Sequence, residues 1–341
     1  MTTGERRAPA ADTGGLVGID RIREAAKVLE GVAIRTPLVP FGPPERRQFL
    51  KAESLQPIGA FKIRGAYYAI ASLTDEQRRR GVITYSSGNH AQGVARAARL
   101  LGAPAVVVMP QGAPAIKAAR VARDGAEIVW VGPSSDEREL VAAKIATERG
   151  LAVIPPYDDD RIIAGQGTIG LEIVESLPDL ALVLVPIGGG GLVSGVAAAV
   201  KALRPSARVV GVEPELAADA RDSLRAGRIV RWRDEDVSRT ISDGTRTSAV
   251  GKRNFPHIAA FVDDIVTVTE AEIAAGVRLA AEESRIVAEP SGALSVAALA
   301  FRAEEIGLGR ADGSVVAVVS GGNVDADRYR EYLAAPLPER P

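Results

Sequence analysis

Short apolar runs alternate along the chain with longer segments in which apolar residues recur at helical spacing. The apolar runs are rich in valine and isoleucine, which is typical of buried strands. Strands are predicted at 81–86, 103–109, 126–132, 151–157, 180–187, 207–213, 263–269 and 313–320. Helices are predicted between most of them, at 88–101, 114–124, 135–149, 161–176, 191–203, 270–284 and 291–306. Such an alternation predicts an α/β fold whose open parallel sheets are flanked by helices on both faces.

The stretch 181–200 tests whether this chain is a membrane protein, because it contains twenty residues without a charge. Four consecutive glycines after a proline make it a poor membrane helix, so a buried strand, a glycine loop and a helix are the better interpretation. The first 15 residues lack the apolar core of a signal peptide. We therefore expect a cytoplasmic protein without a membrane partner.

The amino-acid composition excludes several kinds of binding site and catalytic group. The net charge of −1 provides no basic surface for a nucleic acid. The absence of cysteine excludes disulfides, thiolate nucleophiles and iron–sulfur sites. His90 and His257 are the only histidines, which argues against a multi-histidine metal site.

One lysine stands in an apolar frame. The chain holds 42 lysines and arginines, only seven of them lysines, yet Lys62 lies between Phe61 and Ile63. Arginine stays charged in proteins, whereas the pKa of a lysine falls on burial, as Schiff-base chemistry requires. Lys62 is therefore a candidate reactive amine. The alternative is the start of an amphipathic helix whose lysine extends to solvent.

Two polar or glycine-rich stretches follow predicted strands, where ligands bind in this class of fold. The sequence SSGNHAQG (86–93) offers hydroxyls, an amide and backbone N–H groups at a helix N-terminus. We interpret it as a carboxylate-binding loop, with an ordinary helix cap as the alternative. Four glycines at 188–191 allow backbone amides to converge on a phosphate. A dinucleotide fingerprint fails there, because Val193 or Ser194 occupies the position of its last glycine.

A third such stretch, SGGNVD (320–325), closes the last strong strand, and alone it would be read as a turn. Together with the other features it resembles the fold-type II pyridoxal-phosphate enzymes of the threonine dehydratase (threonine ammonia-lyase) and serine racemase family. The motifs occur in the family's order over about residues 20–325: RTPL (35–38), KAESLQPIGAFKIRGA (51–66), SSGNHAQG, GGGGL (188–192), EPSGA (289–293) and SGGNVD.

The resemblance implies a two-domain fold like that of the tryptophan synthase β chain. A large cofactor-binding domain would consist of 1–80 and 158–341, and a small mobile domain of 81–157. The active site would lie between the two domains. Members of this family lead us to expect a homodimer.

The resemblance also implies roles for individual residues toward pyridoxal 5'-phosphate. Lys62 would form the Schiff base, and Phe61 would pack beside the ring. Asn89 would bond the ring oxygen, and Gly244 would line the pocket. The remaining cofactor contacts would come from Ser320, opposite the pyridine nitrogen, and from Gly188, Gly189, Gly190 and Gly191 around the phosphate. Ala60 departs from the family pattern, which usually has a serine or threonine before Phe-Lys.

For the amino-acid substrate, the resemblance implies a carboxylate site. Its expected residues are Ser86, Ser87, Asn89, His90 and Arg138. Arg138 would close over the substrate. Ser87 would also be the second base, on the opposite face from Lys62, that racemisation requires.

A divalent-cation site like that of the serine racemases is a further expectation. Its ligands would be Glu213, the carbonyl of Ala217, and Asp219. Carboxylate and carbonyl oxygens suit Mg²⁺, with Ca²⁺ or Mn²⁺ as alternatives. The competing interpretation is a helix start with acidic residues near its positive end.

The expected reaction is therefore the dehydration and deamination of L-threonine or L-serine to 2-oxobutanoate or pyruvate and ammonia. Serine racemisation and 3-hydroxyaspartate dehydration are alternatives within the family. Two other classes stay open. A nicotinamide-dependent oxidoreductase would explain the α/β pattern but not Lys62, and a catalytically silent amino-acid sensor would bind the cofactor without turnover.

Overall fold

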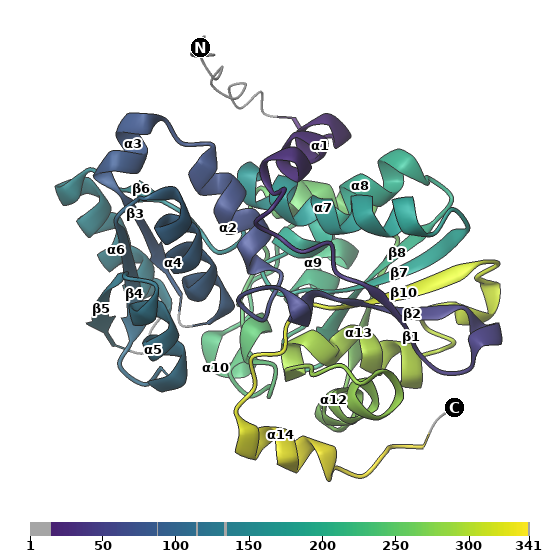
Figure 1. The fold of residues 1–341 in the computed structure, drawn as a ribbon. Coiled ribbons are helices and arrows are strands. Elements are labelled where there is room, and N and C mark those ends of the chain that lie inside the picture. The colour runs from purple at the N-terminus through teal and green to yellow at the C-terminus, as the bar shows by residue number, and fades with distance from the viewer. Residues whose placement is uncertain (1–14, 87, 114, 133–134, 340–341) are drawn as a thin grey trace.

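The computed structural model describes residues 15–86, 88–113, 115–132 and 135–339, and in these residues the strands form two sheets (Figure 1). The larger sheet has the order β1-β2-β10-β7-β8-β9, and its neighbouring strands are parallel except for the antiparallel pair β1 and β2. Its strands are β1 (Leu38–Pro40), β2 (Gln48–Ala52), β7 (Leu180–Pro186), β8 (Arg208–Pro214), β9 (Asp264–Val268) and β10 (Ser314–Val319).

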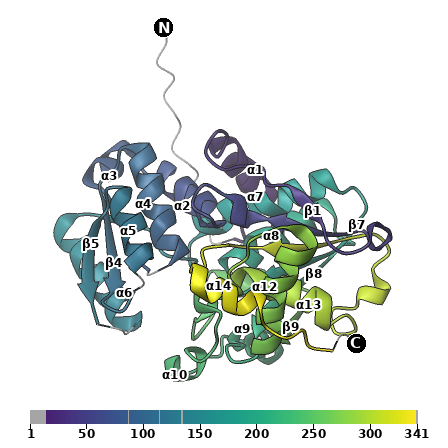
Figure 2. The same cartoon turned by 60° about the horizontal axis from the view of Figure 1, so that its bottom comes forward.

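The smaller sheet has the order β5-β4-β3-β6, and all its strand pairs are parallel. Its strands are β3 (Val82–Tyr85), β4 (Ala105–Pro110), β5 (Glu127–Val131) and β6 (Ala152–Val153). In both views this sheet and its helices stand beside the larger sheet (Figure 2). The four strands lie within the predicted small domain, whose boundaries at 81 and 157 stay a prediction.

Helices cover both faces of the larger sheet. Leu182 and Leu184 of β7 pack in one core cluster, and Val183 and Val185 pack in another on the opposite face. Alternate residues of a strand point to opposite faces, so β7 is buried on both sides. The first face is covered by α12 (Glu270–Ser284) and α13 (Pro290–Phe301), and the second by α7 (Asp160–Ser176), α8 (Gly191–Leu203) and α11 (Asn254–Phe261).

Other helices surround these layers. The smaller sheet packs on α4 (Asn89–Leu101), α5 (Ala115–Arg123) and α6 (Ser135–Arg149). The remaining α-helices are α1 (Ile19–Val28), α2 (Lys62–Ala71), α3 (Asp75–Arg80), α9 (Asp219–Ala226), α10 (Asp234–Val237) and α14 (Ala326–Leu333). Short 3₁₀ helices are η1 (Pro44–Arg46), η2 (Glu53–Leu55), η3 (Asp243–Thr245) and η4 (Leu308–Arg310).

The α/β fold and its sheets flanked by helices are confirmed. The uncharged stretch 181–200 forms β7, the glycine loop and most of α8, as predicted. Within the described residues, no helix is both long and apolar enough to cross a membrane.

Two predicted elements are too long. The strand predicted at 151–157 ends at Val153, because Pro155 and Pro156 have no backbone N–H to donate to a strand ladder. The helix predicted at 291–306 begins at Pro290 and ends at Phe301. The prediction also missed β1 and β2, which are short and lie in a proline-rich segment, and β1 makes the larger sheet mixed rather than purely parallel.

Candidate active site

Lys62 is the first residue of α2, and the buried side of this helix holds it in place. Two residues later, the Arg64 guanidinium donates hydrogen bonds of 2.8 Å to Glu53 and 2.6 Å to Glu172. All of Arg64 is buried, so breaking this ion network would leave an uncompensated charge in the interior. Gly65 and Gly165 bring α2 against α7, since a Cβ on Gly165 would lie only 2.6 Å from the Gly65 Cα. The backbone at Lys62 is therefore rigidly anchored.

The Lys62 amine points into the protein. Its Nζ donates a 2.7 Å hydrogen bond to the Pro156 carbonyl and lies 5.1 Å from the centre of the Phe61 ring. Burial lowers the pKa of Lys62 from 10.5 to about 8, so roughly a tenth of the amine is uncharged at pH 7. The reactive-amine interpretation fits this geometry, and the solvent-extended one does not.

The glycine loop joins β7 to α8. Gly190 has a φ of 96°, a left-handed conformation that favours glycine, and it caps the N-terminus of α8. A Cβ on Gly189 would lie 2.3 Å from ring atoms of Tyr157. The loop is held from the other side by Asn254, whose Nδ2 donates a 2.6 Å hydrogen bond to the Gly189 carbonyl. Free backbone amides and the positive end of the helix dipole make such a loop a favourable place for an anion.

Pro156 and Tyr157 connect the lysine to the glycine loop. The Pro156 carbonyl accepts a hydrogen bond from the Lys62 ammonium, and the next residue, Tyr157, covers Gly189 and Gly191. Burial raises the pKa of Tyr157 to about 12, so its phenol stays neutral. Lys62 and the glycine loop are thus neighbours in space, although more than 120 residues separate them in the chain.

Ser320 and Gly244 meet at Ser291. The Ser320 hydroxyl donates to the Ser291 carbonyl at 3.3 Å, and the Gly244 amide donates to the Ser291 hydroxyl at 2.8 Å. The Ser320 carbonyl also accepts the Phe61 amide at 3.0 Å, so the strand-end serine lies beside the start of α2. Ser320 is buried.

Asn89 is fixed in the same region at the start of α4. Its Nδ2 donates a 2.5 Å hydrogen bond to Glu289, and its Oδ1 accepts one of 2.8 Å from Asn323. Burial, reinforced by the charge of Asp243, raises the pKa of Glu289 to about 8. The two bonds determine which end of the Asn89 amide faces each neighbour.

The other residues predicted to bind the substrate have contacts that are defined to different degrees. His90 is buried, and its Nε2 lies 3.0 Å from the Ile154 carbonyl. Burial, with a smaller effect from Lys62, lowers the pKa of His90 to about 3, so its imidazole is neutral. Ser86 accepts the Gly88 amide at 3.3 Å. Ser87 lies outside the described residues. Arg138 lies on α6, where burial lowers its pKa.

Glu213 and Asp219 form a buried acidic pair at the end of β8 and the start of α9. Glu213 accepts the amides of Ala220 at 3.0 Å and Arg221 at 2.8 Å. Burial and the neighbouring charge of Asp219 raise the pKa of Glu213. Burial raises the pKa of Asp219 to about 7, and neither oxygen of its carboxylate has a well-formed hydrogen bond to the described residues.

Ala217 lies in the turn that joins these two acids, and it is buried. The described residues contain no cluster of three or more histidine, cysteine, aspartate or glutamate side chains that could hold a metal. A cation here would take two carboxylates and complete its shell with carbonyl or water oxygens. That donor set suits a hard divalent ion.

Comparison with known proteins decides the family. The model of the family "Pyridoxal-phosphate dependent enzyme" matches residues 29–321. This chain belongs to that family. It is 43% identical over 286 residues to L-threo-3-hydroxyaspartate ammonia-lyase of Saccharomyces cerevisiae, covering 84% of this chain and 86% of the relative. It is 40% identical over 316 residues to L-threonine ammonia-lyase of Thermotoga maritima, covering 92% of this chain and 77% of the relative. The structure of maize serine racemase superposes with a TM-score of 0.87 at 38% identity. The match covers 93% of this chain and 97% of that structure.

The residues around Lys62 fit pyridoxal phosphate. The lysine amine is partly deprotonated and held among protein atoms, as a Schiff base needs. The glycine loop presents backbone without side chains at the N-terminus of a helix of 13 residues, where an anion such as phosphate is favoured. Ser320 supplies a neutral hydroxyl rather than a carboxylate.

Sequence reasoning missed several residues that build this site. Pro156 and Tyr157 fall within the strand predicted at 151–157, and Pro155 and Pro156 are the only signal there of a turn. No local pattern in the sequence indicates that Asn254 contacts the glycine loop. Ser291 and Glu289 belong to the motif EPSGA, but no role was assigned to them, because their contacts with Gly244 and Asn89 are made only in the folded chain.

Proposed function

We propose that this protein is a pyridoxal-phosphate-dependent ammonia-lyase that converts L-threonine or L-serine to 2-oxobutanoate or pyruvate and ammonia. The water lost in the β-elimination is taken up again when the released enamine hydrolyses, so ammonia is the net leaving group. The observation that carries the proposal is the Lys62 amine, which has a pKa of about 8 and is joined to the glycine loop through Pro156 and Tyr157. The similarity to threonine and hydroxyaspartate ammonia-lyases supports this reaction class.

Pyridoxal phosphate supplies an aldehyde for an amine and an electron sink for negative charge at the substrate α-carbon. In our proposal Lys62 would hold the cofactor, and its free amine would take the α-proton of the bound substrate. Phe61 packs on the same side as the amine. The four glycines, 188–191, hold the phosphate, and Gly244 closes the pocket beside Gly188.

The pyridine nitrogen would face the Ser320 hydroxyl. A serine hydroxyl, unlike an acidic side chain, would leave this nitrogen unprotonated, which would suit β-elimination. Asn89, fixed by Glu289 and Asn323, would orient the ring oxygen. We assign the substrate carboxylate to Ser86, Ser87, Asn89 and His90, with Arg138 closing over it when the small domain of 81–157 moves toward the large one.

Serine racemisation is the second candidate, favoured by the similarity to maize serine racemase. It needs a second base, and we assign that role to Ser87. The purified protein is expected to release 2-oxo acid from L-threonine, L-serine or L-threo-3-hydroxyaspartate. The substrate with the highest kcat/KM identifies the preference, and D-serine formed from L-serine measures racemisation.

Ser87→Ala separates the two activities. It is expected to lower D-serine formation by ~10²–10⁴-fold, the usual value of a general acid–base group, while reducing elimination less. Equal losses in both would contradict the assignment of Ser87 as the racemisation base. Absence of any 2-oxo acid from a cofactor-loaded protein would overturn the lyase. D-serine formation would then favour a racemase, and no turnover of any amino acid would favour a sensor.

We further propose that Glu213, the Ala217 carbonyl and Asp219 bind a divalent cation, with Mg²⁺ favoured over Ca²⁺ or Mn²⁺. The support is the buried acidic pair, whose pKa values are raised by burial and, for Glu213, also by the neighbouring charge of Asp219. A cation bound only by the folded protein raises its stability by about 2.7 kcal/mol at 100 times the dissociation constant.

Titration with MgCl₂ at constant ionic strength is therefore expected to raise the melting temperature of the wild-type protein. Asp219→Asn should remove this response and be more stable than the wild type without the cation. Asp327→Asn, on an exposed part of α14, is the matched control and should respond like the wild type. A response that is identical in all three proteins would rule out this site.

The expected quaternary structure follows from the same resemblance. We propose a homodimer in the cytoplasm, with an amino acid as the small-molecule partner. The molar mass in solution measures the first of these directly.

A further inference from the structure

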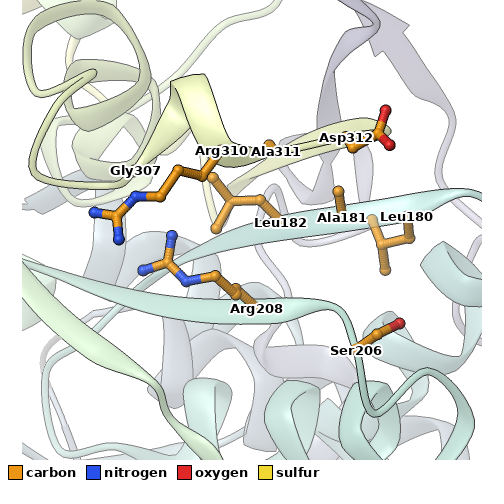
Figure 3. A pocket seen from close by; sticks show the side chains of 9 residues that line it. All are labelled: Leu180, Ala181, Leu182, Ser206, Arg208, Gly307, Arg310, Ala311 and Asp312. Atoms are coloured by element: carbon orange, nitrogen blue, oxygen red, sulfur yellow. The ribbon is translucent and has the colours of Figure 1, made fainter.

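A cavity of about 240 Å³ lies at the amino ends of β7 and β8, the ends of these strands away from the glycine loop. It is lined by the first residues of β7, by Ser206 and Arg208 at the start of β8, and by the turn 307–312 (Figure 3). The glycine loop follows the other end of β7. Six residues of strand separate the two ends, which corresponds to roughly 20 Å. The cavity is therefore distinct from the cofactor site.

Two guanidinium groups meet in this cavity. Figure 3 shows Arg208 and Arg310 with their guanidinium groups on the same side. A Cβ placed on Gly307 would lie 2.6 Å from Nη1 of Arg208 and 3.4 Å from Nε of Arg310, so both groups lie against this glycine. Gly307 has a φ of 66°, which favours glycine and keeps the space open.

The Arg208 side chain is held in place. It is half-buried, and its Nη1 donates a 2.7 Å hydrogen bond to the Ile306 carbonyl. That bond uses one of the five N–H donors of a guanidinium. Its position is thus fixed by the fold, while donors remain for a ligand.

No carboxylate of the described residues pairs with either of these two positive charges. Among the described residues, neither Arg208 nor Arg310 forms an ion pair with a carboxylate. Asp312 lines the cavity, but its carboxylate lies on the far side from the guanidinium groups (Figure 3). Two cations close together repel each other, and an anion that bridges them relieves the repulsion. Paired guanidinium groups bind phosphate through charge-assisted, bidentate hydrogen bonds.

We propose that Arg208 and Arg310 form a second anion site, which binds a phosphate group. The phosphate could be inorganic or belong to a small phosphorylated metabolite, because both present the same oxygens. The proposal does not depend on the reaction that the protein catalyses.

Phosphate titration of the cofactor-loaded protein tests the site, since the glycine loop then already holds the phosphate of the cofactor. Chloride keeps the ionic strength constant, so that general screening does not change. The melting temperature should rise with phosphate and saturate. Arg208→Gln and Arg310→Gln should each raise the calorimetric Kd by ~10–100-fold, as expected for losing a hydrogen-bonding partner of a charged ligand.

Arg330→Gln is the matched control, because Arg330 lies on α14 with 77% of its side chain exposed. It should bind phosphate like the wild type. Arg310 is exposed and makes no ion pair in the described residues, so its replacement leaves folding intact even if Arg208→Gln does not fold. Glycerol 3-phosphate binding more tightly than inorganic phosphate would identify a phosphorylated metabolite as the ligand, and the reverse would identify free phosphate. Equal binding by all variants, an equal effect of acetate, or no saturation would overturn the proposal.

Discussion

Lys62→Ala is expected to abolish turnover and to remove the visible absorbance of the bound cofactor. The substitution removes the amine that would hold pyridoxal phosphate and that would take the α-proton, so kcat should fall by at least ~10³–10⁴-fold. Spectra of the purified variant with added cofactor, and 2-oxo acid release from L-threonine, measure the two effects. Lys62→Arg is the informative companion, because it keeps the positive charge but cannot lose its proton.

The pKa of Lys62 also predicts a pH dependence. The free amine is the nucleophile, so the rate at which the cofactor-free protein takes up pyridoxal phosphate should rise with pH and level off above about 8. A rate that keeps rising to pH 10 would show that the amine is not perturbed. Full cofactor absorbance in Lys62→Ala would refute its assignment as the Schiff-base lysine.

Stability should respond to the same group. The folded-state pKa of about 8 lies below the ordinary value of 10.5, so folding favours the neutral amine. This contribution is present above pH 10.5 and is lost as the pH falls through 8. In the cofactor-free protein, Lys62→Met should therefore raise the free energy of unfolding by roughly 1–3 kcal/mol at pH 6 and by little at pH 10. Chemical denaturation at the two pH values measures the difference.

Gly189→Ala is expected to have the second largest effect. The new methyl group would lie 2.3 Å from the Tyr157 ring, so either the ring or the loop must move. Overpacking of this kind costs about 1–3 kcal/mol, and here it also changes the segment that holds Lys62 through the Pro156 carbonyl. We expect the Kd for pyridoxal phosphate to rise by ~10–100-fold.

Gly309→Ala provides a matched control, because no atom lies within 4 Å of a Cβ at that position and its φ is not in the left-handed region. It should bind the cofactor like the wild type. Fluorescence titration of the cofactor-free proteins gives the dissociation constants. If Gly189→Ala binds as tightly as Gly309→Ala, the loop does not hold the phosphate.

The sequence predicted most of the architecture, because strand and helix periodicities are local properties. Each of the eight predicted strands overlaps a strand of the structure, and α4, α5, α6, α7, α8, α12 and α13 occur where apolar spacing indicated them. The segment 35–52 was missed. Its strands β1 and β2 are three and five residues long, too short for a period to be recognised, and pairing with β10 is what stabilises β2.

The chemistry of single residues was also readable from the sequence. An amine among apolar neighbours, four consecutive glycines after a buried strand, and a serine at the end of the last strand each have a local physical meaning. Their resemblance to one family rests on the order in which they occur, and the comparisons confirm that family.

Only the tertiary structure shows how these parts meet. Tyr157 covers Gly189, Pro156 accepts the Lys62 ammonium, Asn254 holds the glycine loop, and Ser291 joins Gly244 to Ser320. Each contact joins segments far apart in the chain, and no local pattern records it. The pKa of Lys62 belongs to the same class of property, since burial by several elements at once sets it. The sequence determined which groups the site contains, and the packing of distant segments decided their geometry and their charge.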